Sequence, residues 1–184
     1  MDAPAPPEIV LVAHGQLDRV KEILAERPGL LNVMYEPWAE TPLGAASHVG
    51  NREIAEFLLE RGAPLTITTA AMLGRKIDLD RFLAEDPAQA NATGAHGISL
   101  LFHTAYSGDV SIADAILAAG GSTESAGHAL HAAVVKGHQE MVAWLLAQGA
   151  DPNVQDYQGK TPLAVAQERG NETIAATLRA ASGN

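Results

Sequence analysis

Six glycines punctuate this chain, and each is followed by an apolar cluster of the same shape. They are Gly15, Gly50, Gly74, Gly108, Gly137 and Gly170. The segments that they open, such as GNREIAEFLL and GHQEMVAWLL, carry apolar residues four or five and then eight or nine positions after the glycine, which is helical spacing. This self-similarity predicts an array of helical repeats, in which each unit buries its apolar side only against its neighbours.

A second, shorter helix is expected before each glycine, as in TPLGAASHV and TPLAVAQER. These stretches are rich in alanine, which lets neighbouring helices approach closely, and the glycine permits a tight turn into the next helix. Thr41-Pro42 and Thr161-Pro162 each supply an N-cap hydroxyl and a first-turn proline. The predicted unit is therefore helix, turn, helix.

The charge balance excludes one class of partner. The net charge is -10, from 22 acidic and 12 basic residues, and no cluster of lysines or arginines is present to neutralise phosphates. Binding to nucleic acid or to an anionic membrane is therefore not expected.

Cysteine is absent, which fits a reducing compartment. The start of the chain lacks signal-peptide features, and no stretch approaches the roughly 20 apolar residues that span a bilayer. We expect a cytoplasmic monomer.

Two segments resemble the ankyrin repeat: TPLGAASHVGNREIAEFLLERGA at 41–63 and HALHAAVVKGHQEMVAWLLAQGADPNVQDYQGKTPLAVA at 128–166. The resemblance extends from about Pro7 to Leu178, more loosely in the first, third and fourth units. The histidine of the family's TPLH motif is present only as His131. The resemblance implies an all-α ankyrin-repeat solenoid, with short β-hairpin fingers between units, some of them truncated. The chain would then be a single domain, 1–184, with units at approximately 7–40, 41–64, 65–98, 99–127, 128–160 and 161–184.

The spacing of the glycines is irregular, with successive intervals of 35, 24, 34, 29 and 33 residues. Intervals near 33 leave room for a projecting finger, whereas 24 and 29 do not. We therefore predict full fingers at about 31–41, 89–99 and 151–161, and truncated links at 62–68 and 120–128. The concave face would then carry three projections and two recesses, floored by the first helices of the third and fifth units.

The resemblance also implies where a partner binds, because ankyrin proteins generally use the fingers and the exposed side of the first helices. The candidate partner-binding residues at those positions are Tyr35, Trp38, Glu40, His48, Met72, His96, Tyr106, Lys136, Tyr157 and Lys160. Exposed aromatic residues are typical of binding hot spots. For Tyr35 and Trp38 the alternative is that they clamp the first finger onto the first helices.

We therefore expect a non-catalytic adaptor or inhibitor that binds a protein partner on its concave face. An acidic chain favours a partner with a basic patch, chiefly through faster encounter. One alternative is a pocket for a small ligand or substrate in the recesses, around Met72, Leu73, Val135, His48 and Tyr106. Another is a scaffold of generic repeats without a specific partner.

Catalytic and metal chemistry find little support in the sequence. No GxSxG, GxxxxGK or HExxH motif occurs, and Ser47 and His48 are neighbours on a helix that point in different directions. His128 and His131 are three residues apart, but two imidazoles make only half of a tetrahedral site. We expect no catalytic residue, no cofactor and no metal site.

Overall fold

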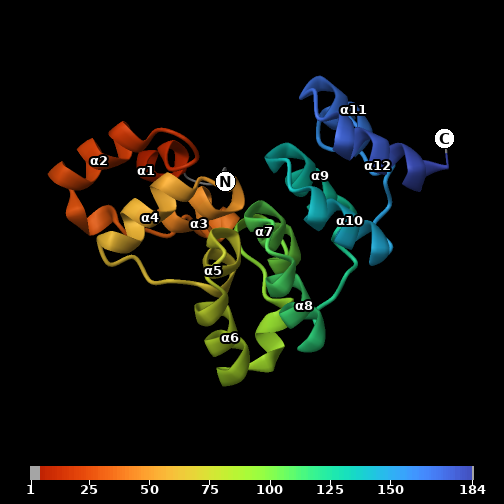
Figure 1. The fold of residues 1–184 in the computed structure, drawn as a ribbon. Coiled ribbons are helices and arrows are strands. Elements are labelled where there is room, and N and C mark those ends of the chain that lie inside the picture. Colours follow the sequence, from red (N-terminus) through yellow and green to blue (C-terminus); the bar gives the residue numbers. More distant parts are fainter. Residues whose placement is uncertain (1–4, 184) are drawn as a thin grey trace.

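The computed structural model describes residues 5–183 as a row of paired helices that follow one another in an arc (Figure 1). The first helix of each pair lines the inner row, and the second helix packs on the outside. The six pairs are α1 (Glu8–Val12) with α2 (Leu17–Glu26), α3 (Pro42–His48) with α4 (Arg52–Glu60), α5 (Ile67–Leu73) with α6 (Lys76–Glu85), α7 (Leu100–Ser107) with α8 (Val110–Ala118), α9 (Ala126–Lys136) with α10 (Gln139–Ala147), and α11 (Pro162–Glu168) with α12 (Glu172–Ser182). This arrangement confirms the predicted all-α solenoid.

Local hydrogen bonds fix where the inner helices begin. The Thr41 hydroxyl accepts from the Gly44 backbone N–H at 3.0 Å, and Thr161 accepts from Ala164 at 3.3 Å. Each threonine precedes a proline at the first helical position, which has no N–H to satisfy. The two Thr-Pro pairs therefore start helices as the sequence predicts.

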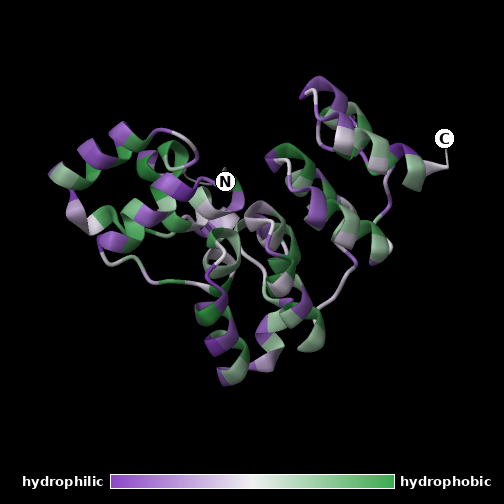
Figure 2. Ribbon diagram, viewed as in Figure 1, coloured by the Kyte–Doolittle hydropathy of each residue, from purple (hydrophilic) through white to green (hydrophobic). Residues whose placement is uncertain are grey.

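Alanines line the contact between successive inner helices. Ala45, Ala70, Ala105 and Ala133 are all fully buried, and because their side chains are small, the inner helices pack closely. Figure 2 shows hydrophobic and hydrophilic residues interleaved along the outer helices α2, α4 and α6, as expected of helices with one buried side. The core continues along the array as three adjoining clusters rather than one centre.

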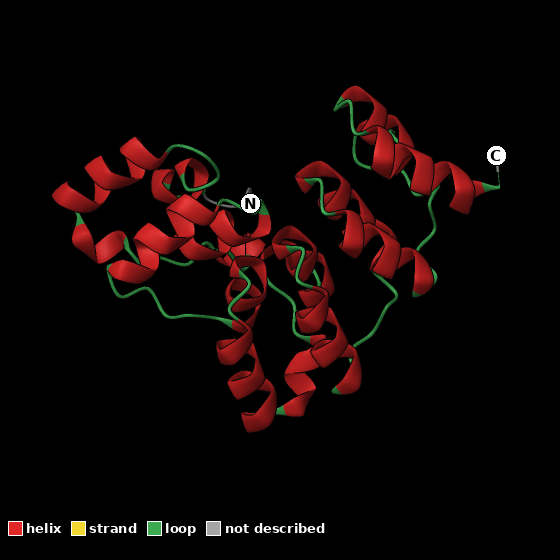
Figure 3. Ribbon diagram, in the orientation of Figure 1, coloured by secondary structure: helices red, strands yellow, loops and turns green. Residues whose placement is uncertain are grey.

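The fingers contain less β-structure than the β-hairpins that were predicted. In the described part of the chain no strand is formed (Figure 3), and the first two fingers close through single bridges, Tyr35 to Glu40 and Thr93 to Ser99. The third closes through a 2.9 Å bond from the Asp156 N–H to the Lys160 carbonyl. Short 3₁₀ turns occupy the remaining length: η1 (Pro28–Leu30), η2 (Glu36–Trp38), η3 (Pro87–Asn91) and η4 (Ala95–Gly97).

None of the helices among residues 5–183 is long and apolar enough to cross a membrane.

Candidate functional site

The second finger changes the predicted shape of the concave face. Its turn η4 packs against α3, so that His96 meets residues of the first finger and of α3. The recess that we expected over α5 is not open, because Met72 and Leu73 on its floor are only 2% and 4% exposed and pack in one core cluster with residues of α3 and α4 and with the Tyr106 ring. The expectation that Met72 is accessible to a partner, or to a small ligand, is wrong.

Two other predicted contact residues are also buried. Tyr35 is part of the core formed by the first units, and Glu40 is completely inaccessible. Tyr35 meets Trp38 edge to face at 4.9 Å between ring centroids, and Trp38 lies 5.3 Å from the His96 ring. For Tyr35 the structure supports the clamping alternative, because a buried ring holds the finger onto the first helices.

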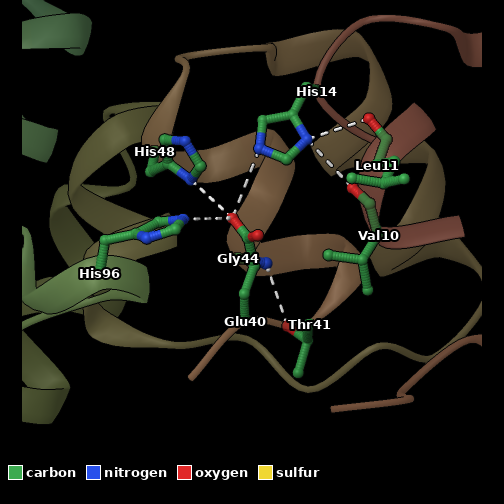
Figure 4. Close-up of polar contacts among 8 residues, drawn as sticks. All are labelled: Val10, Leu11, His14, Glu40, Thr41, Gly44, His48 and His96. Carbon is green, nitrogen blue, oxygen red and sulfur yellow. Dashed lines mark hydrogen bonds and ion pairs between the residues drawn. The ribbon is translucent and has the colours of Figure 1, made fainter. Parts of the chain in front are cut away.

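Glu40 is the centre of a cluster of histidines from different units (Figure 4). Its Oε1 atom lies 2.8 Å from His48 Nδ1, 3.5 Å from His14 Nε2 and 3.6 Å from His96 Nε2. His14 follows α1, His48 ends α3 and His96 lies in η4, so three separate elements bring their imidazoles to one carboxylate. We call these four residues the Glu40 cluster.

Hydrogen bonding does not account for the Glu40 cluster. Neither carboxylate oxygen of Glu40 has a hydrogen-bond partner, and the close approach of His48 Nδ1 lacks hydrogen-bond geometry. The donor atoms of His14, Glu40 and His48 lie within 4.8 Å of one another, a set capable of ligating a metal ion. Sequence spacing does not reveal this set, because its members lie on separate elements and not at a fixed interval on one helix.

His14 itself was not among the predicted site residues, although a signal for it exists. It immediately precedes Gly15, and four of the candidates, His48, Met72, Tyr106 and Lys136, lie one or two positions before the glycines of their own units. The same rule applied to the first unit would have included His14.

Both non-glycine residues with positive φ in the described chain belong to or adjoin this cluster. Ala39, with φ 48°, precedes Glu40, and His96 has φ 56°. Such conformations are costly for residues with a Cβ and persist where the surrounding structure enforces them. The backbone is therefore held in place on two sides of the carboxylate.

Tyr106 of α7 and Lys136 of α9 form a second set of contacts between units that are distant in the sequence. The Lys136 ammonium donates to the Gly50 carbonyl at 3.1 Å and lies 5.3 Å from the centroid of the Tyr106 ring. Burial raises the pKa of Tyr106, so that its hydroxyl stays protonated at neutral pH. Both residues contribute to contacts within the chain, which leaves only part of each for a partner.

An open groove lies over α9, where the second recess was predicted. It encloses about 550 Å³ between α7, α9 and the third finger. Tyr157, at the tip of that finger, is 94% exposed. We call this feature the aromatic groove and define it by Phe102, Tyr106, His128, Ala132, Val135 and Tyr157.

The remaining predicted contact residue on this side, Lys160, is paired with Glu168. Its ammonium lies 2.6 Å from the Glu168 carboxylate, and that hydrogen bond raises the pKa of Lys160. Nearby, His131 Nε2 lies 2.9 Å from the Val154 carbonyl. The TPLH histidine therefore fastens the base of the third finger to α9.

The paired helices, the inner and outer rows and the fingers define a helical-repeat solenoid. Sequence profiles described as "Ankyrin repeats (3 copies)" match residues 67–156 and 101–183, and one described as "Ankyrin repeat" matches residues 40–70. These matches cover more than half of the chain. The chain belongs to the ankyrin repeat family.

Curated relatives share the repeats but are much longer proteins. The nuclear factor NF-kappa-B p105 subunit of Gallus gallus is 27% identical over 195 aligned residues, covering 94% of this chain and 20% of that protein. The potassium channel AKT1 of Arabidopsis thaliana is 51% identical over 51 residues, or 28% of this chain and 6% of the channel. Protein phosphatase 1 regulatory subunit 12A of Mus musculus is 45% identical over 49 residues, or 27% and 5% respectively. The chain thus spans a fifth or less of each of these relatives.

Proposed function

We propose that this chain is a non-catalytic protein-interaction module, an adaptor or inhibitor, that binds a protein partner along its concave face. Ankyrin repeats are generally protein-interaction modules, and the family is generally non-catalytic. Within the concave face we assign the contact to the aromatic groove and the third finger. A cytoplasmic location stays a prediction from the sequence.

The observation that carries this proposal is the exposure of Tyr157 beside the aromatic groove. A tyrosine that is 94% exposed makes little contribution to folding, so its large apolar ring remains available to a partner. Val135 and Ala132 give the adjoining floor an apolar character, and Lys160 and Asp156 at the finger supply charge at its edge. An apolar centre with a polar rim is the usual composition of a protein interface.

The overall charge favours a partner of opposite sign. With its net charge of -10, the chain attracts basic surfaces electrostatically. This attraction acts within about one Debye length, because salt screens it at larger separations. We therefore propose a partner with a basic patch, which would bind faster at low than at high ionic strength.

Tyr157→Ala tests this proposal. We expect about a 30-fold loss of affinity for the partner, because removal of a central hot-spot aromatic costs about 2 kcal/mol or more. Its melting temperature should match that of wild type, since the ring is almost fully exposed. The measurement is affinity capture from the native lysate with quantitative mass spectrometry, followed by titration of the recovered protein.

Ile77→Ala is the matched control, because Ile77 is also a large apolar residue, 86% exposed, but lies on the outer helix α6. We expect Ile77→Ala to retain the same partner as wild type. Equal recovery by wild type and Tyr157→Ala would contradict the assignment of the contact to the third finger.

The volume of the aromatic groove supports a second candidate function. About 550 Å³ lies within the roughly 300–1,000 Å³ of small-molecule sites. A small ligand held there should raise the melting temperature of the protein in proportion to the logarithm of its concentration. The rise should be lost in Val135→Glu, which places a charge on the apolar floor of the groove.

A further inference from the structure

We infer that the Glu40 cluster is a binding site for a divalent transition metal, with Zn²⁺ as the ion that fits its ligands best. Glu40 Oε1, His14 Nε2 and His48 Nδ1 would ligate the ion, and His96 Nε2 would complete the set. Imidazole and carboxylate together suit Zn²⁺ and its first-row neighbours, whereas the hard ions Mg²⁺ and Ca²⁺ prefer oxygen ligands alone. The site is separate from the aromatic groove and does not depend on the proposed partner binding.

The first reason is the burial of an unpaired carboxylate. Glu40 is 0% exposed, and neither of its oxygens accepts a hydrogen bond. Ionised groups are rarely buried without a compensating charge or a metal ion, because they lose their hydration. No lysine or arginine is paired with this carboxylate in the described chain, where the titratable groups that face it are the three imidazoles. A bound cation supplies the missing charge.

The second reason is the tautomer of His14. Its Nδ1 atom lies 3.0 Å from the Val10 carbonyl and 3.0 Å from the Leu11 carbonyl, so this nitrogen carries the proton and donates. In the neutral ring, Nε2 then presents a lone pair toward Glu40 Oε1, 3.5 Å away. Two facing lone pairs repel unless a cation lies between them. Metal-ligating histidines are usually oriented in the same way: one ring nitrogen binds the metal, and the N–H of the other donates to a backbone carbonyl or a carboxylate.

The third reason is the spacing of the donor atoms. Ligands about 2.0–2.1 Å from a tetrahedral Zn²⁺ lie about 3.3–3.5 Å from each other. The separations of His14 Nε2 and His96 Nε2 from Glu40 Oε1, 3.5 and 3.6 Å, are close to that edge length. His48 Nδ1, at 2.8 Å, needs to withdraw by about 0.5 Å to match it. A rotation of the partly exposed His48 ring accomplishes such a shift.

A proton is the competing cation, since one imidazolium can pair with Glu40. One proton, however, serves one imidazole, whereas three ring nitrogens converge on the same oxygen atom (Figure 4). A metal ion accepts all of them at once. Access is available, because the side chains of His14 and His96 are 31% and 38% exposed.

The experiment is a titration of the full, untagged chain, stripped with a chelator, by Zn²⁺ and by Co²⁺ alone. We expect calorimetry to show one Zn²⁺ per chain and Co²⁺ to give the visible absorption of a tetrahedral site. The melting temperature should rise with Zn²⁺ concentration. Glu40→Gln, which keeps the shape of the side chain, should weaken Zn²⁺ binding by more than tenfold, as should His14→Ala, whose side chain is partly exposed.

His128→Ala is the matched control, because it removes an exposed histidine on α9 and should bind Zn²⁺ as wild type does. Circular dichroism establishes that each variant is folded. If Glu40→Gln does not fold, the Zn²⁺ affinity of His14→Ala decides the question. Absence of saturable Zn²⁺ binding to folded wild-type protein would overturn the inference. An imidazolium paired with Glu40 would then be the explanation of the cluster. Retention of wild-type affinity in a folded Glu40→Gln or His14→Ala, or its loss in His128→Ala, would equally overturn it.

Discussion

Gly108→Ala is expected to lower the free energy of unfolding by about 2–5 kcal/mol. Gly108 ends α7 with φ +74°, where a residue with a Cβ pays about 1–2 kcal/mol. The new methyl group would also lie 2.5 Å from Cγ of His138. That ring is held in place because its Nε2 contacts the Tyr106 carbonyl at 3.0 Å, so overpacking adds about 1–3 kcal/mol.

Gly170→Ala separates these two costs. Gly170 occupies the same position in the last unit, with φ +68°, but no atom lies within 4 Å of a Cβ built there. We therefore expect a loss of only about 1–2 kcal/mol, from the backbone conformation alone. Urea unfolding of both variants measures the difference, and an equal loss in the two would show that His138 yields to the new methyl group without cost.

Acidification should destabilise the protein through His103 by about 3 kcal/mol between about pH 6.5 and about pH 4. Burial lowers the pKa of His103 from 6.5 to about 4, a shift that its bond to the Ser99 carbonyl opposes and a charge on His48 reinforces. In this window the unfolded chain binds a proton at this residue and the native chain does not. Stability therefore falls as pH falls, by about 1.4 kcal/mol per pH unit at most.

The check is a series of urea unfolding curves across this range for wild type and His103→Asn. Asparagine keeps an N–H that can donate to the Ser99 carbonyl, but it does not titrate. The other histidines and the carboxylates contribute equally to both proteins, so the difference in pH slope belongs to His103. Parallel slopes would mean that His103 takes up its proton in the folded state as readily as in the unfolded one.

The helical units could be predicted from the sequence because their signals are local. The apolar spacing after each glycine, the Thr-Pro starts and the glycine intervals all act over one or two turns of chain. These local signals predicted the paired helices and the positions of the three fingers. The recess over α9, which depends on the short link before that helix, was also predicted and is present.

The Glu40 cluster could not be predicted in the same way. Glu40 was expected on an exposed finger, and Met72 on an open face, because a sequence does not state the angle at which a finger leans. The second finger leans onto α3 and brings His96 to Glu40, and Met72 is buried with residues of α3 and α4 and with the Tyr106 ring. His14 joins them from a unit whose repeat pattern is weak.

Sequence by itself thus determined the class of fold, the order of the helices and which links are long, since hydrophobic periodicity, capping and loop length are properties of neighbouring residues. Tertiary structure alone decided which side chains are buried and which meet. His14 and Glu40 lie near the two ends of the first unit and His96 lies at the end of the third, and their approach depends on how successive units stack and how each finger packs on its neighbour. Those are sums of many side-chain contacts across units, and no short segment of the chain contains them.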